Sequence, residues 1–236
     1  MKRGILLIIG LLLIGGLGAN ALQQMLELEE NGVRNADLYY NIGVGYWQTG
    51  QSGMANLYFL RSLNLNSAHK PAKENLDYVI ALSQDKDLYP QRPFLLRIFY
   101  ASYDFMNLNR MAVLSLILFA LTGLCLHWLL HYDPLKERGL PTLVFVIVLL
   151  LFLSSVGFLG SKAYRQQHNN RAVLISARVD LRAGASMGAA RIAVLHEAAI
   201  LRVEKREKLW CLVHSPDGKR GWLKNEDVAW VINPAR

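Results

Sequence analysis

The apolar residues of this 236-residue chain gather in three long runs that divide it into segments. Residues 4–19 form the first run. Residues 111–130 and 142–160 form the other two and contain no Lys, Arg, Asp or Glu. A helix needs about 20 apolar residues to cross a bilayer. The second and third runs therefore predict transmembrane helices, which the short turn at 131–141 joins into a membrane hairpin.

The first run is typical of a secretory signal peptide covering residues 1–21. It follows Lys2 and Arg3 and ends in an Ala-Asn-Ala sequence, which suits cleavage after Ala21. An uncleaved anchor is the alternative, although the run is short for a full span. Cleavage would place both soluble regions on the exported side and the turn at 131–141 in the cytoplasm. Basic residues flank both ends of the hairpin and do not decide its orientation.

Residues 22–85 show the spacing of apolar residues that is typical of amphipathic helices. Asn31-Gly32 suits the end of a first helix, and Pro71 suits the first turn of a later one. We therefore expect an all-α region. Residues 86–110 are rich in aromatic side chains just before the first span. This indicates a segment lying in the membrane interface, with a partner-binding helix as the alternative.

One stretch of the helical region, residues 36–69, resembles a tetratricopeptide repeat. The residues that carry the resemblance are Tyr39, Ile42, Gly43, Tyr46, Gly50, Ala55 and Phe59. Gly43 and Ala55 would let two helices approach closely. Ser62 and Ser67 replace the usual Ala and Pro, so this repeat is expected to be weaker than most. A partial second repeat begins near Asn75, and so short an array needs support from flanking helices, another chain or the membrane.

The resemblance also implies a concave, partner-binding face on the first helix of each repeat. The residues at its positions are Asp37, Tyr40, Asn41, Val44, Trp47, Gln48 and, in the partial repeat, Asn75. Large amphipathic rings are common at binding hot spots, and the asparagines could bond to a peptide backbone. In the alternative interpretation, Tyr40 and Trp47 only pack against residues 22–28 or the membrane. The region holds more large rings than so small a bundle can bury, so we expect an exposed aromatic patch.

After residue 171 the pattern changes to short runs with the spacing of β-strands. These runs are residues 173–175, 179–181, 200–203, 210–213 and 221–223. Short strands separated by turn residues predict a small barrel. Segments 177–186, 194–203, 210–213, 217–222 and 227–232 resemble, in this order, the bacterial SH3-like domain. The resemblance implies such a domain at 173–233, after a linker at 161–172. Its pattern has glycine where Ala198 or Ala199 stands, so we expect an altered turn there.

The order of the segments resembles that of the E-type proteins of the bacterial aerotolerance (Bat) operon. The fold class expected is a multidomain membrane protein with an all-α tetratricopeptide-like region, a two-helix transmembrane hairpin and an all-β SH3-like barrel. The resemblance implies the bacterial inner membrane, soluble domains in the periplasm, and a complex linked to oxidative or envelope stress. The partners implied are Bat-type membrane proteins with von Willebrand A domains and an associated MoxR-type ATPase. It implies a non-catalytic assembly protein, and the alternative is an envelope sensor whose SH3-like domain binds peptidoglycan peptides.

Charge and reactive side chains add little chemistry to this picture. The chain has a formal charge of +8, and residues 161–236 carry fourteen Lys and Arg against seven Asp and Glu, a balance of +7. Such a basic region suits anionic head groups or wall polymers, and we expect no nucleic-acid partner. Cys211 and His214 would face opposite sides of one strand, and His127 with His131 suits a membrane boundary better than a metal site. We therefore expect no catalytic residues, metal or cofactor, and no disulfide between Cys125 and Cys211.

We expect mainly structural roles for the remaining histidines and for the charged or aromatic side chains of the β-region. We expect His69, His168 and His196 to be isolated at surface or turn positions. Trp210 and Trp222 are expected to pack within the barrel or at its rim rather than contact a ligand. Five basic residues could face an acidic partner, although charged runs are usually only solvated. These five are Arg182, Arg202, Lys219, Arg220 and Lys224.

Overall fold

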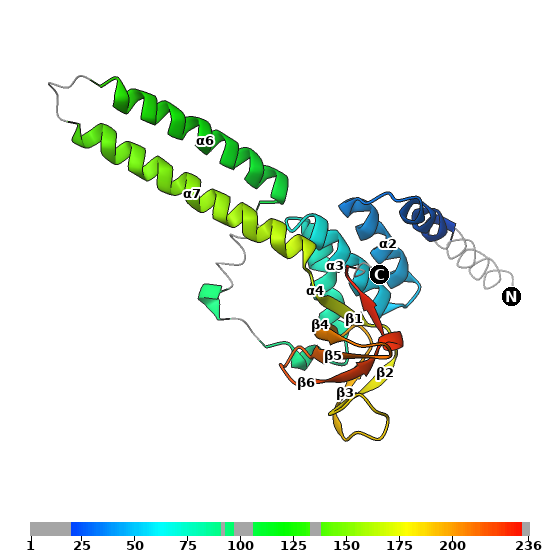
Figure 1. Cartoon of the computed structure of the whole chain (residues 1–236). Coiled ribbons are helices and arrows are strands. Elements are labelled where there is room, and N and C mark those ends of the chain that lie inside the picture. The colour runs from blue at the N-terminus through cyan, green and yellow to red at the C-terminus, as the bar shows by residue number, and fades with distance from the viewer. Residues whose placement is uncertain (1–19, 91–92, 97–105, 133–137, 233–236) are drawn as a thin grey trace. The chain divides into compact units, whose positions relative to one another are not determined.

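The computed structural model describes residues 20–90, 93–96, 106–132 and 138–232 (Figure 1). The chain forms two compact units. The first combines the residues up to Leu96 with those from Asn169 onward, and the second is Arg97–His168. The signal peptide predicted at 1–21 falls almost wholly outside the described residues. The same holds for four of the aromatic side chains predicted to lie in the membrane interface, those of Phe99, Tyr100, Tyr103 and Phe105.

The first unit begins with helices, as the sequence predicts. Residues 20–30 are helical, and α2 (Ala36–Gln48), α3 (Ser52–Leu65), α4 (Lys70–Leu82) and the 3-10 turn η1 (Lys86–Leu88) follow. Gly32 and Gly50 have φ values of 85° and 79°, in the left-handed region that glycine tolerates, and each follows a helix end. Pro71 lies in the first turn of α4, after an N-cap at His69. The helix boundaries therefore follow local sequence signals.

Close packing joins α2 to α3. A Cβ atom added to Gly43 would lie 2.7 Å from the Phe59 ring and 3.2 Å from the Ala55 carbonyl oxygen. Ile42 and Phe59 are fully enclosed beside this contact, as expected from the residue types. Some of the large rings were expected to form an exposed patch, and none of the six rings within residues 39–59 is fully exposed, although three stay partly exposed. Tyr39, Tyr58 and Phe59 are buried, and Tyr40, Tyr46 and Trp47 are half-buried.

The second part of the first unit is one antiparallel sheet of seven strands in the order β3-β2-β6-β5-β4-β1-β7. The strands are β1 (Arg171–Leu174), β2 (Arg178–Arg182), β3 (Arg191–His196), β4 (Ile200–Arg206), β5 (Trp210–His214), β6 (Arg220–Lys224) and β7 (Val228–Trp230). The five predicted runs fall on β1, β2, β4, β5 and β6. The predicted barrel is not closed, because the end strands β3 and β7 do not pair with each other. β7 has only three residues and pairs with β1 alone.

Helices and sheet share one hydrophobic core. The buried cluster of the helical region includes Val173, Ala198 and Val231 from the sheet side. A second cluster lies within the sheet, and Leu88 of η1 packs against it. The two soluble regions, expected to be separate domains, are therefore packed as a single unit.

The second unit is a pair of long apolar helices, α6 (Leu108–Leu130) and α7 (Gly139–Gln167). Both are long and apolar enough to cross a membrane. The rings of Phe119 and Phe152 pack with centroids 5.6 Å apart. Lys162 of α7 is buried and donates a hydrogen bond to the Met106 carbonyl. Residues 161–167, expected in a linker, continue α7 instead.

Candidate partner-binding surfaces

A stripe of polar and small residues on α3 faces the sheet. Gly53, Asn56, Arg61 and Asn64 recur every three to five residues and so lie along one side of the helix. The Asn56 side-chain amide donates to the Ala198 carbonyl at 2.9 Å, and Asn169 donates to Asn64 at 2.8 Å. A Cβ atom on Gly53 would lie 2.6 Å from the Leu174 carbonyl oxygen. This side of the helical region is therefore occupied by the chain itself.

The sheet side contributes matching acceptors and donors. Glu197 accepts from the backbone N–H of Gly53 at 2.7 Å, which satisfies a free amide at the start of α3. Asp85, which is 5% exposed, accepts from the His196 backbone N–H at 2.6 Å and pairs with its Nδ1 at 2.8 Å. The Tyr89 hydroxyl accepts from the Ile200 N–H at 2.9 Å. Burial raises the pKa of Tyr89 to about 12.

The turn at Ala198, expected to be altered, keeps the left-handed backbone that glycine would adopt. Ala198 has a φ of 71°, a conformation that costs a non-glycine residue about 1–2 kcal/mol. Its N–H donates to the Leu174 carbonyl, and its own carbonyl accepts from Asn56. Contacts with β1 and α3 thus hold the turn in a shape that glycine would adopt freely.

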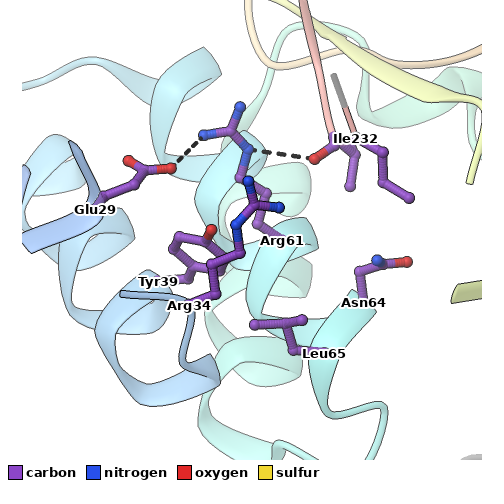
Figure 2. A pocket seen from close by; sticks show the side chains of 8 residues that line it. Glu29, Arg34, Tyr39, Arg61, Asn64, Leu65 and Ile232 are labelled. Carbon is purple, nitrogen blue, oxygen red and sulfur yellow. Dashed lines mark hydrogen bonds and ion pairs between the residues drawn. The ribbon is translucent and has the colours of Figure 1, made fainter. Parts of the chain in front are cut away.

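A pocket of about 230 Å³ lies between the helices and the C-terminal strand (Figure 2). Arg61 crosses it and contacts Glu29 at 3.1 Å, the Val231 carbonyl at 3.3 Å and the Trp230 carbonyl at 3.2 Å. Its guanidinium also lies 4.9 Å from the centre of the Tyr58 ring. Burial and the hydrogen bond to Glu29 raise the pKa of Tyr58. Arg61 therefore joins three parts of the chain and has little capacity left for a ligand.

The structure places the predicted partner-binding residues on α2 and α4, away from the α3 stripe that the sheet covers. We call this surface the α2/α4 face. Asn75 donates to the Tyr40 hydroxyl at 3.4 Å, and Trp47 contacts Tyr78 edge to face at 5.9 Å. Asp37 pairs with His69 at 3.0 Å. Asn41 and Gln48 are exposed, while Tyr40, Val44, Trp47 and Asn75 are half-buried. The face thus combines free amides with partly exposed rings.

A second open site lies on the sheet. This pocket of about 440 Å³ is lined by Arg178, Val179, Asp180, Arg182, Met187, Arg191, Trp210, Lys224, Glu226 and Asp227. Asp180 pairs with Arg182 at 3.4 Å and with Arg191 at 3.7 Å, and Lys224 pairs with Glu226 at 2.9 Å. Trp210 is half-buried and so presents part of its ring. The lining suits a charged peptide better than an apolar ligand.

The remaining candidates for chemistry have structural roles in the described residues. Cys211 is fully buried, and burial raises its thiol pKa to about 11, which disfavours the thiolate that a nucleophile requires. His214 pairs with Glu204 at 3.0 Å instead. The description of His69 and His196 as isolated is wrong, because each pairs with an aspartate from another element. These pairs bring together residues far apart in the chain, and no local signal could have found them.

Four of the five basic residues that could face a partner also form ion pairs or hydrogen bonds within the sheet region. Arg220 makes two bonds to Glu204, at 2.6 and 2.7 Å, and these bonds lower the pKa of that carboxyl. Lys219 pairs with Asp217 at 2.8 Å. Arg182, besides its contact with Asp180, donates to the Met187 and Ala189 carbonyls. Arg202 is exposed.

Comparison with known families identifies one part of the chain. A family model described as the bacterial SH3 domain matches residues 176–229. The match covers β2 to β6 and most of β7, and it omits β1. No curated protein matches the chain, and no solved structure does.

Proposed function

We propose that this protein is a non-catalytic assembly protein of a bacterial inner membrane, resembling the E-type proteins of the Bat operon. Its helical region, of tetratricopeptide type, would bind a segment of a membrane partner on the α2/α4 face. The SH3-like domain would support the helices by packing against α3. The partners proposed are membrane proteins with von Willebrand A domains, with a MoxR-type ATPase as a further component.

The burial of one side of the helical region carries this proposal. The polar stripe of α3 is bonded to the sheet, whereas the α2/α4 face keeps exposed amides beside half-buried rings. Residues of this kind are typical of binding surfaces rather than of inert surface. The face also lies on two helices held rigidly by a shared core, which suits capture of a partner segment.

Affinity capture of the tagged full chain from detergent-solubilised membranes tests the proposal. Trp47→Ala removes the largest ring of the face, and Asn41→Arg changes an exposed residue without disturbing packing. Both should reduce recovery of the same membrane proteins by at least about tenfold, the loss expected for a hot-spot residue. Arg202→Gln, an exposed change on the sheet, is the control. Unchanged recovery with both variants, at normal folding, would contradict the proposal.

The orientation in the membrane is a separate part of the proposal. We place both soluble regions in the periplasm and the turn near Lys136 in the cytoplasm. A periplasm-active reporter fused after Arg236 should then be active, and the same reporter inserted at Lys136 should be silent. Activity at Lys136 alone would reverse the orientation.

An envelope sensor is the second candidate function. The charged pocket beside Trp210 favours it, because a peptidoglycan peptide carries both amino and carboxyl groups. Binding of the full chain to purified sacculi, abolished by Arg178→Glu but unaffected by Asn41→Arg, would support the sensor. The converse pattern, with no binding to sacculi, would support the assembly protein.

A further inference from the structure

The turn between β4 and β5 presents an apolar side chain among cations. Leu209 is 74% exposed, the largest exposure among the large apolar residues of the described 169–232 stretch. Lys205, Arg206 and Lys208 surround it in the sequence and are exposed. Within residues 205–210 three cations face one anion, Glu207, which pairs with Lys205 at 2.8 Å. We call residues 205–210 the basic tip.

The basic tip is held in a fixed shape. The Glu207 N–H donates to the Trp210 carbonyl at 2.8 Å and closes the turn. Asn225 donates to three successive carbonyls of the tip, those of Glu207, Lys208 and Leu209, at 2.8, 3.2 and 3.0 Å. The Arg206 guanidinium lies 4.7 Å from the centre of the Trp230 ring. These bonds fix the backbone around Leu209, so its exposure is a property of an ordered turn. The turn would have to break these bonds for Leu209 to become buried.

The basic tip lies at the end of the sheet where the chain enters it from α7. β4 runs antiparallel to β1, and Asn170 bonds to Val203 in both directions at 2.8 Å. Asn170 is also where the chain enters the sheet after α7. β4 therefore runs back toward this entry point, and the tip extends about 15–20 Å beyond the Asn170–Val203 pair at 3.3 Å per residue.

The connection between the apolar run of α7 and the sheet has a length similar to the extension of the basic tip. The apolar run of α7 ends at Gly160, and seven helical residues followed by three more lead to Asn170. At 1.5 Å per helical and about 3.4 Å per extended residue, this connection spans roughly 20 Å. If α6 and α7 cross a bilayer, a connection of this length limits how far the sheet can lie from the bilayer surface, and the extension of the basic tip is of similar size.

We propose that the basic tip docks on the surface of the bilayer that holds α6 and α7, with the cations on anionic phospholipid head groups and Leu209 at the head-group boundary. Each lysine or arginine near an anionic surface strengthens binding by about fivefold, and because Glu207 offsets one of the three cations the tip gains roughly twenty-five-fold. An exposed apolar residue adds burial in the interface. The nearby anions oppose this weakly, because Glu204 is bonded to Arg220 and Glu226 to Lys224. This inference rests on the membrane hairpin of the proposed function and on neither partner-binding surface.

The test uses the full chain reconstituted in vesicles. Cys125 and Cys211 are replaced by Ala, and a fluorescent probe is attached through Glu207→Cys. Quenching of the probe by brominated phosphatidylcholine then reports its contact with lipid. Vesicles of phosphatidylcholine alone are compared with vesicles that also contain phosphatidylglycerol. Lys219→Cys carries the probe for the control, because position 219 lies at the other end of β5.

We expect quenching at position 207 to be at least threefold greater in the vesicles containing phosphatidylglycerol, and to fall as salt is added. Neutralising the cations with Lys205→Gln, Arg206→Gln and Lys208→Gln together should remove this increase. Leu209→Ser should reduce it, and the probe at 219 should show no increase.

Equal quenching in both lipid compositions, or equal quenching at 207 and 219, would overturn the inference. So would protection of the probe at 207 that depends on a co-purified protein instead of on phosphatidylglycerol, since the tip would then be a protein interface. Flotation with the vesicles reports insertion of α6 and α7 separately. Failure to float would overturn the membrane hairpin, and the docking inference with it.

Discussion

The helices α3 and α4 are neighbours of nearly equal length, yet one is enclosed and the other is open. α3 buries eight of its 14 residues, whereas α4 buries three of its 13. The buried set of α3 includes Gly53, Asn56 and Ser62, which a hydrophobic pattern alone would leave at the surface. The difference arises because α2, α4 and the sheet all pack against α3, while the described residues leave the outer side of α4 uncovered. A helix face rich in amides can therefore be structural or available, and only its neighbours decide which.

The largest effect is expected from removing the sheet that packs against α3. A chain ending at His168 lacks the whole sheet and exposes the Ala198 and Val231 contacts of the helical core. Fewer than ~70 residues of helix supply only a few kcal/mol of stability. The helical region should then lose its cooperative unfolding transition and become protease-sensitive, as limited proteolysis in detergent would show. A cooperative transition at the temperature of the intact chain would mean that α3 does not need the sheet.

Removing the Asp85 carboxylate should have the next largest effect. Asp85→Ala leaves the partly buried His196 N–H without its partner and deletes the link between the segment after α4 and β3. We expect a loss of about 2–3 kcal/mol in the free energy of unfolding of the full chain, measured with urea in detergent. Asp87→Ala, an exposed change two residues along, should cost little. Similar losses for the two variants would show that the Asp85–His196 pair contributes nothing specific.

A methyl group on α3 should separate the helix from the sheet. Gly53→Ala places its Cβ atom 2.6 Å from the Leu174 carbonyl oxygen and 3.1 Å from the Ile175 Cα. Overpacking of this kind costs about 1–3 kcal/mol. In Gly188→Ala, the matched control, the nearest atom to the new Cβ would be 3.9 Å away. If the two variants unfold at the same urea concentration, the close approach of α3 to β1 is wrong.

Alkaline pH should weaken the contact made by Tyr89 after α4. Its folded-state pKa of about 12 lies above the ordinary value of 10.0. The phenol therefore stabilises the fold fully below pH 10, and this contribution falls between pH 10 and 12 by up to about 1.4 kcal/mol per pH unit. The slope of stability against pH in that window should be shallower for Tyr89→Phe than for the natural chain. An equally steep slope for Tyr89→Phe and the natural chain would contradict the assignment.

The smallest effect is expected at a buried hydroxyl of α3. Ser62 is fully buried, and its oxygen has no hydrogen-bond partner in the described part of the chain. Ser62→Ala removes a desolvated polar atom without changing the packing, so it should be neutral or stabilise the fold by up to about 1 kcal/mol. Thermal unfolding of the full chain in detergent measures this. A loss of stability would reveal a partner for the hydroxyl and place Ser62 among the satisfied groups of α3.

The sequence by itself determined the parts of this protein that depend on neighbouring residues. Apolar runs at 111–130 and 142–160 specified the two long helices, because length and hydrophobicity are local properties. Gly50 and Pro71 marked helix boundaries, since the backbone angles they allow are local too. Five strands followed from the spacing of apolar residues, and the bacterial SH3 domain was identified from five segments, four of which lie wholly within the family match at 176–229. The packing of Gly43 against Phe59 followed from a repeat pattern within 34 residues.

Tertiary structure alone decided how the two soluble regions combine. The contacts of Asn56 with Ala198, Asp85 with His196 and Arg61 with Val231 join residues more than 100 positions apart, and nothing in either local sequence indicates the other. Arg61 lies against the buried Tyr58 ring, and the contacts of Ala198 with Asn56 and Leu174 hold its left-handed turn. Such bonds form only where the shared core brings the two backbones together. For that reason, the division of the helical region into a covered side and an open side could be read only from the fold.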